Sequence, residues 1–194
     1  MTALRFVRSV WESFRATSGL EPRLLDNLRV TAAKPGTVNF ELDIEKHHTV
    51  SISLSRYFIL HRRFVSFAAA FANFNLLMLG SDVFQNRLSI LHGGTIASMV
   101  DLGGSLAVAS RGLYATGVST DLNVTYLSSG GKVGDKLLAE VTCDKFGKTL
   151  AYTNIRFMNS KGDVFARGSH TKYVSLAWKD PQNIVEELNE RKSS

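Results

Sequence analysis

Hydrophobic and polar positions alternate through most of the chain after Gly117. This two-residue period, with many β-branched and aromatic side chains, is typical of β-strands. Gly147 and the polar run 159–162 supply turns, and consecutive strands joined by short connections predict an antiparallel meander. The predicted strands are residues 117–129, 136–146, 148–159 and 163–175.

The same alternation marks a hairpin nearer the N-terminus. Residues 27–33 and 36–44 both alternate, and the Pro35-Gly36 pair between them predicts a tight turn. In the second stretch the apolar residues share one face, as in a half-buried strand. These residues are Val38, Phe40, Leu42 and Ile44.

Two segments follow helical spacing instead. The basic, amphipathic segment 1–19 resembles a mitochondrial targeting peptide, but Glu12 and its continuity into Leu20 favour a folded first helix. Residues 95–110 form a second helical segment that is apolar on nearly every side, so it must be surrounded. We therefore expect an α+β protein in one domain, 1–194, with a curved antiparallel sheet wrapped around this helix. Residues 176–194 are expected to form a charged tail.

Residues 50–85 differ in composition from the rest of the chain. They hold six of its twelve phenylalanines, and residues 64–80 carry no charge over 17 positions. That length is the low edge of what crosses a bilayer. Three interpretations stay open: a lid over an acyl-binding site, a membrane-associated segment, and a retained intron.

The retained intron is the favoured interpretation of this insertion. Removing it joins Thr49 to Asn86 without a break in the pattern, and Val50 and Gln85 have codons that fit the two ends of an intron. Sequencing of transcripts decides the question, since a mature message that always carries the segment rejects the idea. Membrane contact is expected only if residues 50–85 belong to the mature protein.

Composition and charge narrow the classes of partner. The chain is 44% hydrophobic, which allows a sizeable core, and its net charge of +6 favours anionic partners. The basic residues are scattered, so no nucleic-acid binding is predicted. Cys143 is the single cysteine, which excludes an intrachain disulfide, and its alternating segment favours a buried structural thiol.

One carboxylate interrupts the apolar helix. At 100° per residue Asp101 shares a narrow stripe with Ser98 and Ser105, and the small Gly104 beside them is expected to leave room for a substrate. The opposite face is expected to anchor the helix in the core. It holds Ile96, Met99, Val100, Leu102 and Leu106.

Gly93 and Gly94 stand where this helix begins. The first N–H groups of a helix lack intrahelical partners and can hold an oxyanion. An oxyanion site together with the Asp101 carboxylate suits acyl transfer. The alternative is that the two glycines form a turn and that Asp101 pairs with a hydroxyl in the core.

Three stretches carry a family resemblance: "NRLSILHGGTIASMVDLGGSLAV", "GVSTDLNVTYLSS" and "GKTLAYTNIRFMNSKGDVFARGSHTKY". The spacing of Asn, His-Gly-Gly and Asp, followed by Gly-Val-Ser, resembles the hotdog-fold acyl-CoA thioesterases. The small eukaryotic enzymes for medium- and long-chain fatty acyl-CoA are the most similar. The resemblance covers about residues 20–49 and 86–174. It implies a hotdog fold and hydrolysis of acyl-CoA to a fatty acid and coenzyme A.

The resemblance also implies catalytic roles. Asn86, His92 and the Gly93 amide would polarise the thioester carbonyl. Asp101 would be the general base or nucleophile, and Ser119 would place the attacking water. Each site would lie between two subunits of a homodimer, with Asn86, His92 and Gly93 from one chain and Asp101 and Ser119 from its partner. A dimer of dimers stays open.

Further residues are candidates for contacts with coenzyme A, whose phosphates need basic or backbone donors. Because coenzyme A is part of the substrate, no separate cofactor is expected. His47 and His48 lack companions at metal-ligand spacing, so no metal is expected, and His170 is expected to be structural. The candidate substrate contacts are Gly94, Gly117, Val118, Lys145, Lys148, Arg167 and Lys172.

Three rival functions stay open. They are a hotdog dehydratase, a non-catalytic acyl-CoA-binding module, and a membrane-attached scaffold that uses residues 50–85. The intact set of predicted site residues favours catalysis, because a binding module does not need the carboxylate. The compartment, cytoplasmic or mitochondrial, also stays open.

Overall fold

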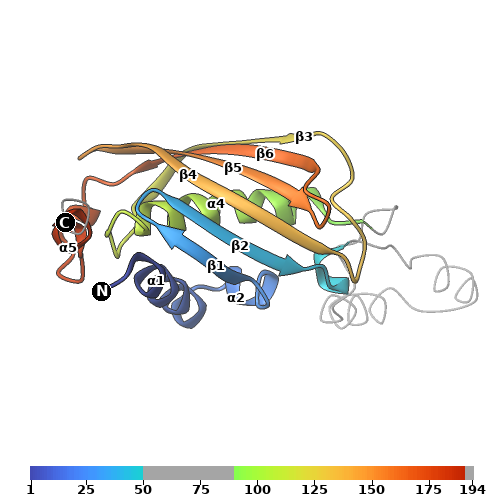
Figure 1. Cartoon of the computed structure of the whole chain (residues 1–194), viewed down its shortest axis with the longest axis horizontal. Helices are drawn as coiled ribbons and strands as arrows, with labels where there is room; N and C mark the ends of the chain where they lie inside the picture. Colours follow the sequence, from blue (N-terminus) through green and yellow to red (C-terminus); the bar gives the residue numbers. More distant parts are fainter. Residues whose placement is uncertain (50–89, 191–194) are drawn as a thin grey trace, which may run out of the picture.

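The computed structural model describes residues 1–49 and 90–190, in which a six-stranded antiparallel sheet curves around one long helix (Figure 1). This arrangement confirms the predicted α+β class. The insertion 50–85 and Asn86 lie outside the described residues. The elements are α1 (Ala3–Thr17), α2 (Glu21–Leu24), β1 (Arg29–Lys34), β2 (Thr37–Asp43), η1 (Lys46–His48), α4 (Gly93–Ala109), β3 (Val118–Tyr126), β4 (Lys136–Phe146), β5 (Leu150–Asn159), β6 (Val164–Tyr173), η2 (Ala177–Lys179) and α5 (Val185–Glu190).

The strand order is β1-β2-β4-β5-β6-β3. The predicted hairpin is β1-β2, and β4, β5 and β6 form the predicted meander. The expectation that the first strand of the meander lies beside the second is wrong, because β4 pairs with β2 while β3 pairs only with β6. β3 is therefore an edge strand of the described sheet.

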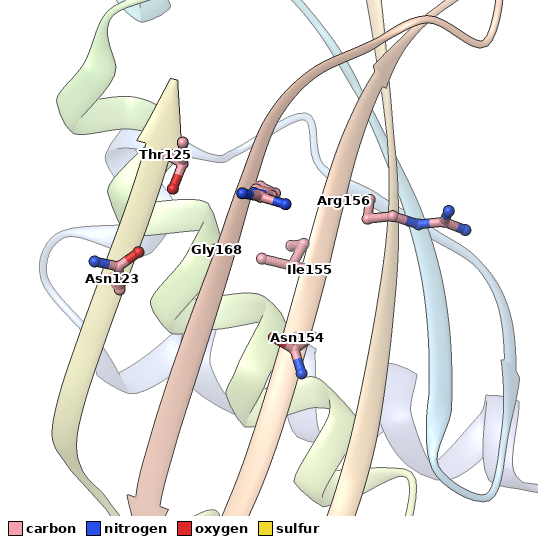
Figure 2. A pocket seen from close by; sticks show the side chains of 7 residues that line it. Asn123, Thr125, Asn154, Ile155, Arg156 and Gly168 are labelled. Carbon is pink, nitrogen blue, oxygen red and sulfur yellow. The ribbon is translucent and has the colours of Figure 1, made fainter. Parts of the chain in front are cut away.

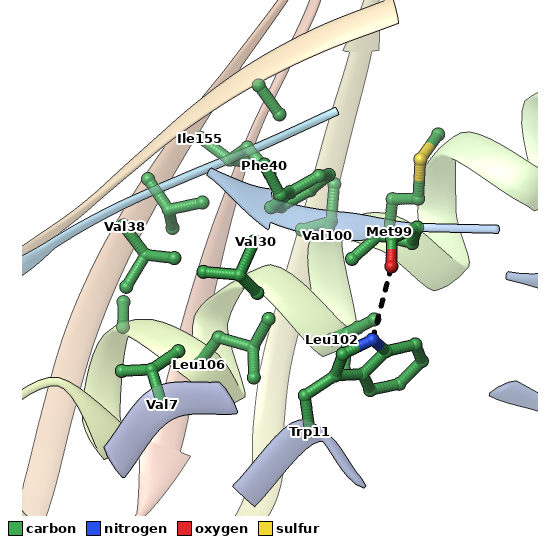
Figure 3. Packing of buried hydrophobic residues seen from close by; sticks show 14 of the residues in the cluster. Val7, Trp11, Val30, Val38, Phe40, Met99, Val100, Leu102, Leu106 and Ile155 are labelled. Atoms are coloured by element: carbon green, nitrogen blue, oxygen red, sulfur yellow. Dashed lines mark hydrogen bonds between the residues drawn. The ribbon is translucent and has the colours of Figure 1, made fainter. Parts of the chain in front are cut away.

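The helix α4 fills the concave side of the sheet, with contacts to five of the strands and to α1. Its predicted anchoring residues are all buried, which confirms that face of the helix. Figure 3 shows Met99, Val100 and Leu102 against side chains of the sheet and of α1. Because protein cores are close-packed, these buried contacts fix the position of α4 relative to the strands.

The core also includes α1, although this helix lies before residues 20–49, where the family resemblance begins. Val7 and Val10 of this helix are completely buried, and the indole Nε1–H of Trp11 donates to the Leu28 carbonyl at 3.2 Å. The Arg8 guanidinium donates to the Val30 carbonyl on β1 at 2.8 Å. A folded first helix is thereby confirmed.

The two segments that flank residues 50–89 are joined to each other by main-chain hydrogen bonds. Thr49 and Leu91 form an isolated antiparallel bridge, and the His92 N–H donates to the His48 carbonyl at 3.0 Å. These contacts fix the start of α4. None of the helices in segments 1–49 and 90–190 combines the length and apolar character needed to span a membrane.

Candidate active site

His92 caps the N-terminus of α4. Its backbone is extended, and its Nδ1 accepts a hydrogen bond from the Gly94 N–H at 2.9 Å. Because Nδ1 uses its lone pair in this way, the neutral imidazole carries its proton on Nε2. The cap therefore occupies the Gly94 amide and leaves an Nε2–H donor on His92.

Gly93 is the first helical residue, and its amide is available as a main-chain donor. Within segments 1–49 and 90–190 its N–H has no acceptor. Its carbonyl accepts a hydrogen bond from the Tyr126 hydroxyl at 2.8 Å. A Cβ at this position would lie 3.2 Å from the Tyr126 ring, so glycine permits this close approach.

Two turns further along α4, Asp101 meets side chains from two strands. The Ser119 hydroxyl of β3 donates to Oδ1 of Asp101 at 2.9 Å. Nε2 of His170, on β6, lies 2.9 Å from the Ser119 oxygen and 3.3 Å from Oδ1 of Asp101. His170 is buried, whereas the Asp101 side chain is 47% exposed and open to an incoming molecule.

The hydrogen bonds of this cluster fix its proton arrangement. Ser119 has one proton, which it gives to Asp101, so it must accept from Nε2–H of His170. Burial lowers the pKa of His170, the positive charge of Lys172 lowers it further, and Asp101 opposes the shift. His170 is therefore a neutral donor at physiological pH. The structure brings the predicted Asp101 and Ser119 together.

The space beside Gly104 is not available to a substrate, contrary to the sequence-based expectation. A Cβ at Gly104 would lie 2.4 Å from Nδ1 of His170 and 2.8 Å from Oγ1 of Thr153. Gly104 is small because the imidazole packs against the helix backbone there. Gly104 therefore makes room for the buried His170 and not for a substrate.

Lys172 is buried, with 3% of its surface exposed. Its ammonium donates to the Ser105 hydroxyl at 2.8 Å, and Ser105 donates to the Asp101 carbonyl at 3.1 Å. Burial lowers the pKa of Lys172. The predicted contact of Lys172 with coenzyme A phosphates at the mouth of the site does not fit this position.

The other predicted substrate contacts occupy different places. Lys145 and Lys148 are exposed around the turn between β4 and β5. Gly117 has a positive φ of 77° and packs against Tyr173, and Val118 is 61% exposed where β3 begins.

Arg167 faces away from the Asp101 cluster. It lies three residues before His170 in one strand, so the two side chains point to opposite faces of the sheet. Arg167 and its cross-strand partner Arg156 both line a pocket of about 330 Å³ on the side away from α4. Figure 2 shows Arg156 among the residues of this pocket. Within one chain Arg167 therefore cannot serve the substrate at Asp101.

The structure brings Asp26 beside His47 and His48, with possible ligand atoms within 4.8 Å of one another. However, Nδ1 of His48 accepts from the Glu45 N–H at 2.8 Å, which places the proton of the neutral ring on Nε2. Burial, followed by the charge of His47, lowers the pKa of His48 to about 4. This ring has no free lone pair for a metal, so we assign no metal to the cluster.

Sequence reasoning missed the roles of His170, Ser105 and Tyr126. The alternation of β6 places His170 and Lys172 on one inward face, and this signal is visible in the sequence. Which helix residues they meet depends on the strand order and on the position of α4 across the sheet. Neither is contained in the alternation.

Comparisons with known proteins agree with this geometry. The model of the thioesterase superfamily matches residues 88–166. A candidate esterase of Schizosaccharomyces pombe is 38% identical over 183 residues, which cover 94% of this chain and 91% of the relative. Acyl-coenzyme A thioesterase 13 of Homo sapiens is 29% identical over 153 residues, which cover 78% of this chain and 83% of the relative.

Solved structures give the same result. Zebra fish thioesterase superfamily member 2 is 28% identical in sequence to this chain, and its crystal structure matches with a TM-score of 0.64. The match covers 89% of this chain and 98% of the zebra fish chain. The mouse thioesterase superfamily member 2 is 25% identical with a TM-score of 0.60, over 87% and 96% of the two chains. The chain belongs to the thioesterase superfamily and has its hotdog fold. Its class of reaction is thioester hydrolysis.

Proposed function

We propose that this protein hydrolyses fatty acyl-coenzyme A to a free fatty acid and coenzyme A. The observation that carries the proposal is the half-exposed Asp101 carboxylate, held by Ser119 beside the buried His170. The choice of acyl-CoA is supported by relatives named acyl-coenzyme A thioesterase 13. The net charge of +6 suits the phosphates of such a substrate.

Each active site combines residues from two copies of the chain. Gly93 and Asp101 are eight residues apart on α4, so a rise of 1.5 Å per residue separates them by about 12 Å. A water held at Asp101 must lie about 3 Å from the carbonyl carbon whose oxygen Gly93 binds. Within one chain, Gly93 and Asp101 are therefore too far apart to act on the same carbonyl group. A second copy of the chain that brings its own Gly93 and His92 to Asp101 removes this difficulty.

The edge strand β3 supports this homodimer. Leu122 pairs with His170 and Tyr126 pairs with Ala166, so both side chains share the face that carries α4. Leu122 is nevertheless 39% exposed and Tyr126 is 52% exposed. An uncovered edge strand with apolar side chains is a ready surface for pairing with a second copy.

In the proposed mechanism Asp101 acts as a general base. It takes a proton from a water that Ser119 helps to hold, and the water oxygen attacks the thioester carbonyl. The partner's Gly93 N–H and the partner's His92 Nε2–H stabilise the oxyanion, with Asn86 predicted to assist. The intermediate then expels the coenzyme A thiolate, which receives the proton held by Asp101.

The test is thiol release from palmitoyl-CoA by the full chain and by Asp101→Asn. Loss of the base is expected to lower kcat by at least about a hundredfold without loss of the fold, because the amide has the same shape. Asp26→Asn, at an exposed aspartate outside the site, is the control and is expected to keep wild-type turnover. Burial raises the pKa of the Cys143 thiol, so its background reaction with the thiol reagent should be small.

The rival functions give different results in this assay. A dehydratase would hydrate an enoyl thioester without releasing a thiol. An acyl-CoA-binding module would bind palmitoyl-CoA and release none. Wild-type turnover in Asp101→Asn would reject Asp101 as the base.

A further inference from the structure

The ammonium of Lys172 is a buried charge that the proposed mechanism does not use. A lysine has three N–H donors, and in the described residues Ser105 is the one hydrogen-bond acceptor of Lys172. A buried ammonium with few partners costs free energy of folding. A lysine in this position therefore contributes little to stability.

The contacts of Lys172 lead to the catalytic carboxylate by two routes. The first runs through Ser105, which bonds both the Lys172 ammonium and the Asp101 main-chain carbonyl. Ser105 and Asp101 are four residues apart on α4 and share one face of the helix. The lysine therefore holds the turn of α4 that carries Asp101.

The second route runs through His170. Lys172 and His170 are alternate residues of β6 and point to the same face. The charged groups that act on the imidazole are Lys172 from its own strand and Asp101 from α4. The neighbouring strands β3 and β5 present the uncharged hydroxyls of Ser119 and Thr153. The positive charge of Lys172 favours the neutral imidazole that donates to Ser119.

We propose that Lys172 is a positioning residue that, through Ser105 and His170, fixes the carboxylate and the hydroxyl presented to the thioester by Asp101 and Ser119. This inference rests on the proposed hydrolysis of acyl-CoA. It gives the buried lysine a function within the site. It also explains why a costly charge sits beside the catalytic helix.

The proposal predicts a separation of stability from activity. Methionine has nearly the shape of lysine without its charge, and Asp101 is too exposed to become a buried unpaired charge when the ammonium is removed. Lys172→Met is therefore expected to have a Tm no lower than wild type. Its kcat is expected to fall about tenfold to a hundredfold, because small displacements of catalytic groups have effects of that size.

Two readouts distinguish this role from a purely structural one. Without the charge of Lys172, the pKa of His170 rises, which an NMR titration of the imidazole resonances measures directly. A protonated His170 would pair with Asp101 and weaken it as a base. The low-pH limb of kcat/KM is thus expected to move to higher pH in Lys172→Met, with palmitoyl-CoA as substrate.

Matched variants separate the two routes. Ser105→Ala removes the bridge but keeps the charge, so kcat should fall while the titration of His170 stays as in wild type. Lys161→Met makes the same substitution in the exposed turn between β5 and β6 and should change neither kcat nor the titration. The titration of His48 serves as an internal reference.

An unchanged His170 titration in a folded Lys172→Met, or wild-type kcat in that variant, would overturn the proposal. If Lys172→Met does not fold, Lys172→Gln replaces it in both measurements. A wild-type chain that hydrolyses no acyl-CoA would overturn the proposed function. The His170 titration in Lys172→Met would even then decide whether the lysine acts on the imidazole.

Discussion

Gly104 leaves the space in which the His170 ring packs against α4. Alanine at this helix position would be favoured by roughly 1 kcal/mol from helix propensity alone. Its Cβ would however lie 2.4 Å from Nδ1 of His170 and 2.8 Å from Oγ1 of Thr153. The imidazole must then move away from Ser119.

We expect Gly104→Ala to lower the free energy of unfolding by about 1–3 kcal/mol, the usual cost of overpacking a core. Thiol release should fall at least about tenfold, because the donor to Ser119 is displaced. Urea unfolding and the palmitoyl-CoA assay measure the two effects. Gly19→Ala is the control, since a Cβ there meets nothing within 4 Å. A Gly104→Ala chain as stable and active as Gly19→Ala would contradict this account.

At the scale of single residues, the sequence predicted which side chains take part in the chemistry but not which side chains contact them. The stripe of α4 identified Asp101, and the family resemblance supplied Ser119, whose hydroxyl the structure places 2.9 Å from the Asp101 carboxylate. The role of Gly104 was predicted wrongly. A glycine on a helix face looks the same in the sequence whether the space beside it holds a substrate or a buried imidazole. His170 was predicted to be structural, and its contact with Ser119 was missed.

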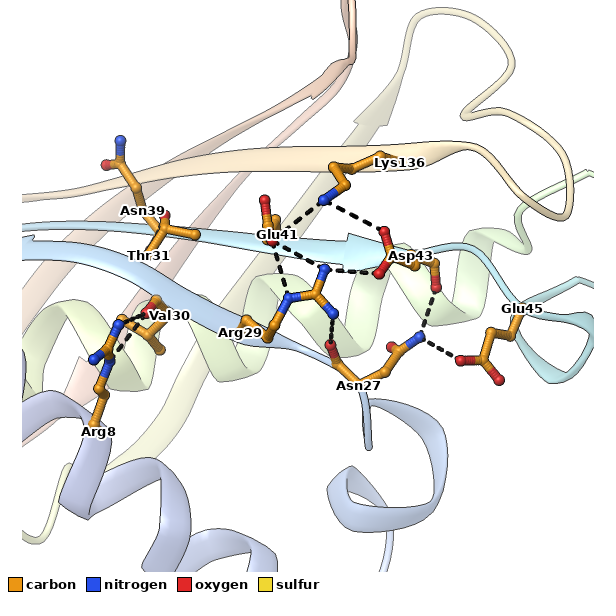
Figure 4. A network of polar contacts seen from close by, with 10 residues as sticks. All are labelled: Arg8, Asn27, Arg29, Val30, Thr31, Asn39, Glu41, Asp43, Glu45 and Lys136. Carbon is orange, nitrogen blue, oxygen red and sulfur yellow. Dashed lines mark hydrogen bonds and ion pairs between the residues drawn. The ribbon is translucent and has the colours of Figure 1, made fainter.

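The hairpin β1-β2 is tied to β4 by an exposed polar network (Figure 4). The Arg29 guanidinium bonds Glu41 at 2.9 Å and Asp43 at 2.7 Å, and Lys136 lies 3.3 Å from Glu41. The hydrogen bond from Arg29 is the main cause that lowers the pKa of each carboxyl. This network joins three strands on the solvent side.

We expect the network to stabilise the protein in a pH-dependent way. Carboxyls with lowered pKa values stabilise the fold above their unfolded pKa, near 4, and that contribution is lost as the pH falls through the lowered folded values. Arg29→Ala should cost less than about 1 kcal/mol at pH 7, because the pairs are exposed. Urea unfolding at about pH 2.5 should show a smaller deficit than at pH 7. The exposed Arg5→Ala should behave like wild type at both pH values, and an Arg29→Ala deficit that is equally large in acid would exclude this origin.

Helices and strands were predictable because their periods are local, but the strand order was not. The predicted strand 117–129 is β3, yet β3 lies beyond β6 while β4 pairs with the earlier β2. The alternation indicates that a strand has one buried face, but it does not indicate which strand lies beside it. The position of Ser119 beside His170 follows from this order, since Ser119 pairs with Lys172, two residues after His170 on β6.

At the scale of the whole molecule, the proposed homodimer makes each chain the source of two half-sites. The start of α4 offers the Gly93 amide and the His92 Nε2–H, and its middle offers Asp101 with Ser119. The proposed two-fold dimer would bring each half against the other half of its partner, because an isologous interface repeats every contact twice. The sequence alone could suggest this arrangement through family resemblance, whereas the helix geometry gives it a physical reason.

A shared site predicts complementation between two inactive chains. Asp101→Asn leaves the oxyanion half intact, and His92→Ala leaves the carboxylate half intact, so each homodimer should show reduced thiol release. Unfolding and refolding an equal mixture should make half of the dimers mixed, each with one complete site. The mixture should then recover about a quarter of wild-type activity, above the sum of the separately refolded variants. Light scattering on the same samples measures the dimer. If each active site is complete within one chain, the mixture will show only the average of its parts, and the proposed division of the site between subunits will be wrong.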